Sequence, residues 1–355
     1  MEFCSSYGLK LPVLLAPMAG ACPVALSSAV SNAGGMGAMG ALITPPSGIR
    51  AWVEEFRSVS HGAFQLNTWI PDPMPRRDPG AEQRMRAFLA QWGPPVPETA
   101  GDSGPPDFAA QCEMFLTLAP TAVSSIMGVF PSAFVARLKE RGIAWFATVT
   151  TLEEARIAVA AGADVVVAQG FEAGGHRGSF DQAAAERQGV GLLALVPRLA
   201  DHIDRPIVAA GGIGDGRGIA AALTLGASAA MLGTAFLQCP EAQTHPAWAN
   251  ALRDLEPEGT VLTRAWTGWL ARAVATDFVR AAASPAAPPP ALYPVQRYLT
   301  SPMREAGTAA GDQHRMQLWA GQSAAMGRQI PASEMVKAIW QSVQRKGPPS
   351  AILCK

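Results

Sequence analysis

The chain has 355 residues, of which 49% are hydrophobic and 16% are charged. This composition is typical of a globular protein with a large core and excludes a disordered or fibrous chain. Lys and Arg together number 28, and Asp and Glu also number 28, so the net charge is zero. Proteins that bind nucleic acids or anionic membranes normally carry a basic surplus, so neither partner is expected.

The cysteine pattern and the lengths of the apolar runs predict a protein of the cytoplasm. The five cysteines are scattered, and no two of them form a C-x-x-C pair. Reduced thiols are therefore expected, and not disulfides or a zinc site. The first twenty residues lack a basic segment followed by an apolar core, so no secretory signal is expected. No apolar run reaches the length of a membrane span.

Short apolar runs recur along the chain, each followed by a segment with helical periodicity. Eight of them are apolar on both faces, as the buried strands of a parallel sheet are. In chain order they are residues 13–18, 36–42, 63–67, 122–127, 144–149, 165–169, 207–210 and 229–232. Among the helical segments, 152–161 follows Thr151 and 217–225 follows Asp215, both side chains that can cap a helix.

Eight strand–helix units predict an α/β fold, a (β/α)8 TIM barrel over residues 1–239. A doubly wound sheet is the alternative, but no run has the polar character of an edge strand, and this favours a closed barrel. Residues 71–106 contain two Pro- and Gly-rich stretches around a short helix. They are expected to form an excursion after the third strand, with a lid as one interpretation.

Residues 240–355 lie beyond the last predicted strand and have a mainly helical pattern. The clearest predicted helices are 318–326 and 334–344. A barrel that closes at the eighth strand does not need this part of the chain. It is expected to form a helical cap over one mouth of the barrel, with a terminal helix that returns to the barrel wall.

The strongest chemical signal is the string Gln169-Gly170-Phe171-Glu172-Ala173-Gly174-Gly175-His176-Arg177-Gly178, directly after the sixth strand. Active sites of this fold form at the carboxyl ends of the strands. Glycines let a backbone turn tightly beside a ligand, and an imidazole is suited to proton transfer near neutral pH. His176 is therefore the candidate catalytic residue. The alternative is a solvated histidine in a turn. Glu172 either acts as an acid or base or only orients the loop.

Glycines also end the seventh and eighth strands, at Gly211-Gly212 and at Gly233-Thr234. The loops after these strands are the usual phosphate site of the fold, because their N–H groups are exposed. The pairing of the two motifs predicts a phosphate cradle, with tight helix–strand packing as the alternative.

The end of the first strand, Ala16-Pro17-Met18, could lay a flat backbone edge against a planar ring. Asn67 ends the third strand, and its amide could donate or accept a hydrogen bond beside a ring carbonyl. Cys22 is read as a buried small residue. The five lysines avoid every predicted strand end, so the site is not expected to depend on a lysine. A helix dipole or Arg177 would then supply positive charge.

Several common catalytic patterns are missing from the sequence. It contains no P-loop lysine pattern, no H-E-x-x-H, no histidine or carboxylate cluster at metal spacing and no G-x-S-x-G elbow. A metalloenzyme and an α/β-hydrolase are therefore not expected.

These motifs together resemble the nitronate monooxygenases, the family once called 2-nitropropane dioxygenases. The specific element is the string from Gln169 to Gly178. The strand-one, glycine-pair and late Leu318-Trp319-Ala320-Gly321-Gln322 motifs extend the resemblance over nearly the whole chain. The resemblance implies an FMN-binding barrel with a helical cap, acting on a small molecule with O2, and it leaves a homodimer open.

The resemblance also implies a role for each matching residue. His176 matches the catalytic base. Ala16, Pro17, Met18, Asn67 and Gln169 match positions beside the flavin ring. The phosphate and ribityl positions are Gly174, Gly175, Gly211, Gly212, Gly233 and Thr234. One departure concerns the end of the fourth strand, where relatives carry Ser-Phe-x-Phe-Gly and this chain has Ser124-Ser125-Ile126-Met127-Gly128. It bears on the substrate more than on the flavin.

Three functions are compatible with these patterns. The leading one is an FMN-dependent monooxygenase that oxidises alkyl nitronates with O2 to a carbonyl compound and nitrite, with His176 binding the anionic nitro group or taking an α-proton. The second is an FMN- and NAD(P)H-dependent enoyl or quinone reductase, or a specialised flavin oxidase of a biosynthetic pathway. The third is a flavin-free phosphate-binding protein or lyase.

Overall fold

The computed structural model describes residues 2–346, and its central feature is a barrel of eight parallel strands. The strands hydrogen-bond in the order β1-β9-β8-β6-β5-β4-β3-β2. A parallel bridge between Leu14 and Met36 joins β1 to the start of β2 and closes the ring. The predicted TIM barrel is confirmed. Its strands are β1 (Val13–Leu15), β2 (Gly37–Gly40), β3 (Phe64–Trp69), β4 (Ala122–Ile126), β5 (Ala144–Val149), β6 (Val165–Gln169), β8 (Ile207–Ala210) and β9 (Ala229–Leu232).

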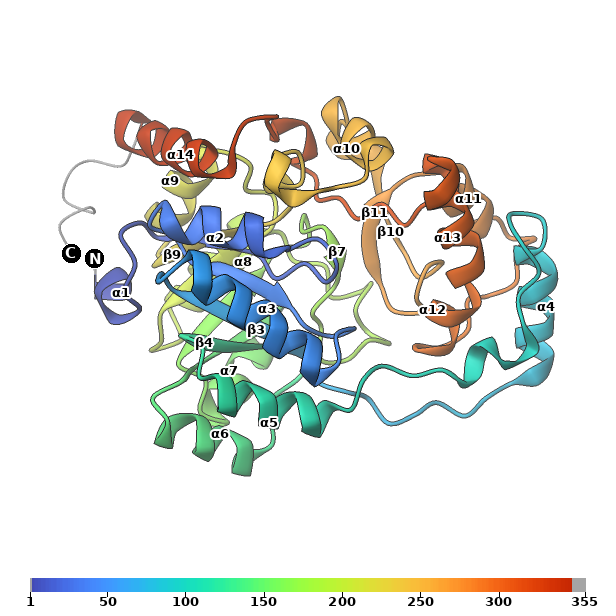
Figure 1. Cartoon of the computed structure of the whole chain (residues 1–355), viewed down its shortest axis with the longest axis horizontal. Coiled ribbons are helices and arrows are strands. Elements are labelled where there is room, and N and C mark those ends of the chain that lie inside the picture. Colours follow the sequence, from blue (N-terminus) through green and yellow to red (C-terminus); the bar gives the residue numbers. More distant parts are fainter. Residues whose placement is uncertain (1, 347–355) are drawn as a thin grey trace.

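Helices surround the strands in the expected alternation. Thr151 accepts a hydrogen bond from Glu154 N at 3.2 Å and caps α7, and Asp215 accepts one from Arg217 N at 2.8 Å and caps α9. The last helix, α14, packs against α9 and α2 and so takes the place of the eighth barrel helix (Figure 1). The barrel helices are α2 (Val24–Asn32), α3 (Pro46–Val59), α5 (Phe108–Leu118), α6 (Ser132–Glu140), α7 (Leu152–Ala160), α8 (Leu192–Ala200), α9 (Gly216–Thr224) and α14 (Ala332–Lys346).

Alternate residues of most barrel strands enter two separate apolar cores. In β6, Val166 and Ala168 face the layer between strands and helices, whereas Val165 and Val167 face the barrel interior. Both faces are buried, and this explains the continuous apolar runs in the sequence. The short helix α1 (Glu2–Ser6) packs against the interior cluster through Phe3.

The four cysteines among the described residues have free, buried thiols. They are Cys4, Cys22, Cys112 and Cys239. Cys354 lies outside the described residues.

The region between β9 and α14 forms a cap beside the barrel mouth. It contains two strands that the sequence reading missed, β10 (Thr260–Thr263) and β11 (Ala271–Val274), which pair antiparallel. β11 also pairs with β7 (Gly175–His176), the short strand in the glycine-rich loop of the barrel. The remaining cap elements are η2 (Thr234–Phe236), η3 (Pro240–Ala242), α10 (Pro246–Arg253), η4 (Pro257–Gly259), α11 (Asp277–Ala282), α12 (Val295–Leu299), α13 (Ser301–Ala310), η5 (Gln313–Arg315) and η6 (Ala324–Met326).

The excursion after β3 packs on the cap. Its helix α4 (Pro79–Leu89) contributes Met85 and Leu89 to an apolar cluster with Trp266 and Phe278 of the cap. The 3-10 helix η1 (Glu98–Asp102) lies against α12. The excursion is therefore a packed part of the cap side of the molecule (Figure 1), and not a detached lid.

The prediction of a helix over residues 318–326 is wrong. Trp319 forms an antiparallel bridge with Ala273, and only Ala324–Met326 makes a short 3-10 turn. The backbone groups of this segment bind other parts of the chain: Leu318 O accepts from Val274 N at 2.9 Å, and Gly321 N donates to Thr234 Oγ1 at 3.0 Å. Pairing with the cap strand therefore replaces the local helical hydrogen bonds.

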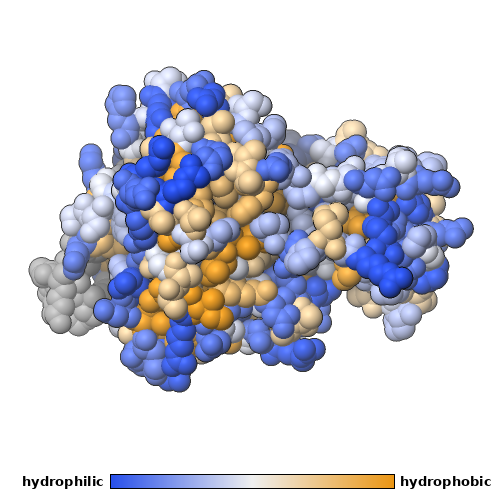
Figure 2. Space-filling model, turned by 90° about the horizontal axis from the view of Figure 1, so that it is seen from below, coloured by the Kyte–Doolittle hydropathy of each residue, from blue (hydrophilic) through white to orange (hydrophobic). Residues whose placement is uncertain are grey.

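On the face shown in Figure 2, the surface is hydrophilic over most of the cap, and the barrel presents an apolar area. The most exposed large apolar side chain of the barrel helices is Leu193 on α8, which is 71% exposed. None of the helices within residues 2–346 has both the length and the apolar character that a membrane-spanning segment needs.

A buried carboxylate holds the excursion together. Glu82 of α4 is almost fully buried and forms ion pairs with Arg77 and Arg86. Arg77 also donates to Gly101 O at 2.8 Å and to Asp102 Oδ1 at 2.9 Å. The hydrogen bond from Arg77 lowers the pKa of Glu82.

Replacing Glu82 with Ala is expected to lower the free energy of unfolding by about 3 kcal/mol, because two arginines lose a desolvated partner. The matched control is Asp102→Ala, which removes a 65% exposed partner of the same Arg77 and is expected to cost under ~1 kcal/mol. Urea unfolding followed by tryptophan fluorescence measures both. Equal losses of unfolding free energy in the two variants would show that the buried Glu82 does not stabilise the excursion more than the exposed Asp102 does.

Candidate functional site

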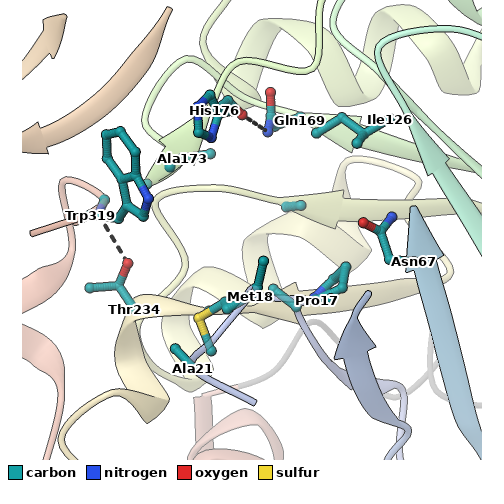
Figure 3. Close-up of a pocket in the computed structure, with 18 of the residues that line it drawn as sticks. Pro17, Met18, Ala21, Asn67, Ile126, Gln169, Ala173, His176, Thr234 and Trp319 are labelled. Atoms are coloured by element: carbon teal, nitrogen blue, oxygen red, sulfur yellow. Dashed lines mark hydrogen bonds between the residues drawn. The ribbon is translucent and has the colours of Figure 1, made fainter. Parts of the chain in front are cut away.

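A cavity of about 360 Å³ opens at the carboxyl ends of the barrel strands, beside the cap. Its size lies within the range of small-molecule and cofactor sites, about 300–1,000 Å³. Figure 3 shows Pro17 and Met18 on one wall and His176 and Gln169 on the wall facing them. The predicted catalytic residue and all the predicted cofactor-binding residues line this cavity: Ala16, Pro17, Met18, Asn67, Gln169, Gly174, Gly175, His176, Gly211, Gly212, Gly233 and Thr234.

His176 lies between two tryptophans on the cavity wall. The centroid of its ring is 4.5 Å from that of Trp69, the last residue of β3, and 4.9 Å from that of Trp319 of the cap. Both contacts are edge-on. Its Nε2 atom lies 2.8 Å from the hydroxyl oxygen of Thr267, and its backbone pairs with Ala271. Barrel and cap therefore share the placement of this imidazole.

The imidazole of His176 is neutral over the physiological range. Burial lowers its pKa to about 3, and the positive charge of Arg297 acts in the same direction. A base with so low a pKa accepts a proton poorly at neutral pH. The arrangement favours binding of an anion by a neutral hydrogen-bond donor over removal of a proton from carbon.

Gln169 holds the loop that carries His176. Its Nε2 donates to His176 O at 3.0 Å, and its Oε1 accepts from Gly178 N at 2.7 Å. Both ends of the amide are thus engaged with the protein. Arg177 donates to Gln169 O at 2.7 Å, lies over the ring of Phe171 and does not line the cavity. The expectation that Arg177 could supply positive charge at the site is wrong.

The glycine pairs form a cradle of backbone N–H groups. Gly211 and Gly212 have φ values of +107° and +68°, which a residue with a Cβ rarely adopts. Among residues 2–346, the N–H groups of Gly212, Ile213 and Gly233 donate to no protein acceptor, and all three residues line the cavity. Such a group of free donors suits a phosphate.

The glycine-rich barrel loop and the segment around Gly321 approach each other closely at Gly174. A Cβ atom on Gly174 would lie 2.5 Å from Gly321 N and 3.0 Å from Thr234 Oγ1. The barrel loop therefore touches the segment from the cap directly. This contact requires the absence of a side chain at position 174.

Asn67 presents an acceptor to the cavity. Its Nδ2 donates to Ser124 Oγ at 3.0 Å and to Ser124 O at 3.2 Å, which leaves Oδ1 directed at the cavity (Figure 3). A carbonyl oxygen matches a ring N–H of a ligand. It does not match the ring carbonyl that sequence reasoning also considered.

The turn after β1 is held by a buried thiol. Cys22 Sγ donates to Ala16 O and accepts from Met18 N, both at 3.3 Å. Burial raises the pKa of Cys22 to about 12, so the thiol stays protonated. Cys22 is a structural residue under the wall that Ala16, Pro17 and Met18 form, as predicted.

Two arginines of the cap supply the full charges on the cavity wall. Arg297 of α12 and Arg304 of α13 line the cavity, and no Asp, Glu or Lys among the described residues does. Arg304 donates to Gln317 Oε1 at 2.7 Å and to Arg297 O at 2.9 Å, and burial lowers its pKa to about 10. Neither guanidinium forms an ion pair with a described carboxylate, so this side of the cavity attracts anions.

Sequence reasoning missed several residues of this site. Trp69 carries a usable signal, because it lies two positions after Asn67 in a strand whose alternate residues share a face. Thr267, Arg297 and Arg304 carry none, because long-range pairing in the cap brings them to the barrel. Glu172, one candidate acid or base, accepts from Leu192 N at 3.0 Å at the start of α8 and does not line the cavity.

Comparison with known proteins agrees with this geometry. The family model described as nitronate monooxygenase matches residues 4–342. The nitronate monooxygenase of Paraburkholderia phytofirmans is 38% identical over 344 residues, covering 95% of this chain and 93% of that protein. That of Pseudomonas aeruginosa is 38% identical over 349 residues, covering 97% and 99%. The nitroalkane oxidase structure from Streptomyces ansochromogenes has a TM-score of 0.88 at 37% identity, covering 97% of this chain and 98% of that one.

Because the pKa of His176 is lower in the folded protein than in the unfolded chain, the free energy of unfolding depends on pH. Its folded pKa of about 3 lies below the ordinary value near 6.5, so the unfolded chain binds the extra proton between these values. Its contribution to stability is complete above about pH 6.5 and is lost as the pH falls toward 3.

Between pH 7 and pH 5, the wild type is therefore expected to lose roughly 1–2 kcal/mol more stability than His176→Gln. Urea unfolding at the two pH values measures the difference. The control is His61→Gln, a change of an exposed histidine, which is expected to keep the wild-type pH dependence. A wild-type slope in His176→Gln would mean that His176 is not the buried neutral group.

Proposed function

Because the chain belongs to the nitronate monooxygenase family, we propose that it is an FMN-dependent monooxygenase that oxidises alkyl nitronates with O2 to a carbonyl compound and nitrite. The observation that carries this proposal is the electrostatics of the cavity. A neutral His176 and two arginines without carboxylate partners line it, and this combination suits an anionic substrate. A nitronate is such an anion, and it has already lost its α-proton, so its oxidation needs no strong base.

The residues present fit FMN. The free N–H groups of Gly212, Ile213 and Gly233 suit its phosphate. Asn67 Oδ1 suits a ring N–H, and the backbone of residues 16–18 lies along the wall for the ring. When bound, the flavin would supply the redox chemistry that the oxidation of a nitronate by O2 requires.

The chain's own residues bind and orient the substrate. His176 holds the nitro oxygens, and Arg297 adds positive charge on the same side of the cavity. Trp69 and Trp319 flank the imidazole and exclude water from it. A dry site strengthens each of these electrostatic interactions. Ile126, in the segment where the chain departs from its relatives, also lines the cavity and gives that wall an apolar surface.

A spectroscopic experiment tests the function. Purified protein is expected to show a flavin absorbance spectrum, which anaerobic nitronate changes and anaerobic NADPH does not. His176→Asn is expected to keep the FMN spectrum while kcat/KM for nitronates falls about 10- to 100-fold, the value of a hydrogen bond to a charged group. Bleaching by NADPH alone would support the reductase. Protein that stays colourless with added FMN would support the flavin-free alternative.

A second experiment tests the charge. Arg297→Gln is expected to raise KM for nitronates about tenfold, with a smaller change in kcat, because it removes attraction for an anion without breaking an ion pair. The wild-type KM is expected to rise with salt more steeply than that of the variant.

Arg297→Lys, which keeps the charge, should retain most of the affinity. Arg156→Gln, on the outer face of α7 and 55% exposed, should change nothing. A KM that is the same in Arg297→Gln and the wild type at low salt would contradict a role for this charge.

A further inference from the structure

We propose that Thr267 is a positioning residue that fixes the imidazole of His176 in the tautomer with its proton on Nδ1, so that an N–H donor is available to the ligand in the cavity. The inference rests on the proposed function in one respect only, namely that a nitronate oxygen is the acceptor. The tautomer itself follows from contacts within the protein.

Backbone hydrogen bonds on both sides of the contact hold the two groups in place. Thr267 is fully buried in the loop between β10 and β11. Gly268 N donates to Arg264 O at 2.8 Å and tightens this loop. On the other side, His176 pairs with Ala271, and Arg177 N donates to Leu270 O at 2.8 Å. The hydroxyl and the ring are therefore set by the same antiparallel pairing.

The distances decide which group donates the hydrogen. The Thr267 hydroxyl has one hydrogen and two acceptors within reach, His176 Nε2 at 2.8 Å and Trp269 O at 3.4 Å. Hydrogen bonds from hydroxyls to oxygen acceptors normally span about 2.5–3.0 Å, so the carbonyl is too distant to compete. The hydroxyl therefore donates to Nε2.

The opposite arrangement is unfavourable. If Nε2 carried the proton and donated to Thr267, the buried hydroxyl would have only the distant Trp269 carbonyl as its acceptor. A buried hydroxyl whose only acceptor is at so long a distance is disfavoured, because its hydrogen bond is weak. Nε2 is thus the acceptor, and in a neutral ring the proton resides on Nδ1.

The remaining ring nitrogen is left for the ligand. Nδ1 forms no hydrogen bond with residues 2–346, and the ring lines the cavity. Trp69 and Trp319 contact the ring at interplanar angles of 66°, and a tryptophan side chain has an N–H donor but no nitrogen or oxygen acceptor. Arg297 is the charged group that acts on the ring, and it disfavours a second proton. The ring therefore donates one hydrogen bond, from Nδ1, to an anion.

The test compares two variants of the FMN-loaded enzyme. Thr267→Val keeps the shape of the side chain and removes the hydroxyl, and Thr267→Ser keeps the hydroxyl. Protein labelled with ¹⁵N-histidine is examined by long-range ¹H–¹⁵N spectra, with His176→Asn assigning the signals. The wild type and Thr267→Ser are expected to show a protonated Nδ1 and an unprotonated Nε2, and Thr267→Val is expected to lose this pattern.

Activity supplies a second readout. Thr267→Val is expected to lose about 10- to 100-fold in kcat/KM for nitronates, the range found when the partner that orients a metal-ligating histidine is removed. Thr267→Ser should restore most of the activity, and FMN affinity should be equal in all three proteins. A protonated Nε2 in the wild type, or an unchanged tautomer in Thr267→Val, overturns the inference.

These measurements distinguish a failure of the role proposed for Thr267 from a failure of the proposed function. The expected tautomers in a protein that does not oxidise nitronates would support the role of Thr267 and overturn the proposed function. If Thr267→Val does not fold, the wild-type spectrum still decides the tautomer, and Thr267→Ala then serves as the hydroxyl-free variant.

Discussion

The site depends on one piece of backbone pairing, between the two residues of β7 and the cap strand β11. It places His176 opposite Ala271 and Gly175 opposite Arg272. Arg272 strengthens the junction, since its Nη2 donates to Phe171 O at 2.9 Å. Without this pairing the glycine-rich loop would be a flexible turn, and the imidazole would have neither its hydroxyl partner nor Trp319 beside it. The cap is thus part of the active-site wall, and not only a cover.

The barrel could be predicted from the sequence because its signals are local. Continuous apolar runs, capping side chains and strand-end glycines each report on a few neighbouring residues, and the carboxyl ends of parallel strands meet by the rule of the fold. The residues chosen at those ends do surround one cavity. The cap could not be predicted in the same way. The strands β10 and β11 are short and flanked by irregular chain. Residues 318–326 have a helical sequence pattern, but in the folded protein Trp319 pairs with Ala273, and this pairing replaces a helix.

The carboxylates near the glycine-rich loop and the arginines at the cavity have different surroundings. The nearby carboxylates are used on the protein's own backbone: Glu154 accepts from Phe180 N at 2.7 Å, and Glu172 accepts from Leu192 N at 3.0 Å. Neither faces the cavity. The arginines of α12 and α13 are consequently left without ionic partners. Buried positive charge that is not neutralised is costly to a fold, and such charge at a cavity is a mark of function.

The long separations in the sequence also set the order in which the molecule can mature. His176 meets Thr267, which lies 91 residues further along the chain, and the eighth barrel helix α14 comes after the whole cap. On the ribosome, most barrel strands emerge well before the residues that complete the catalytic wall, and contacts between distant segments form late. The residues that orient the imidazole are therefore synthesised after all eight barrel strands, and the helix that completes the barrel wall is synthesised after them.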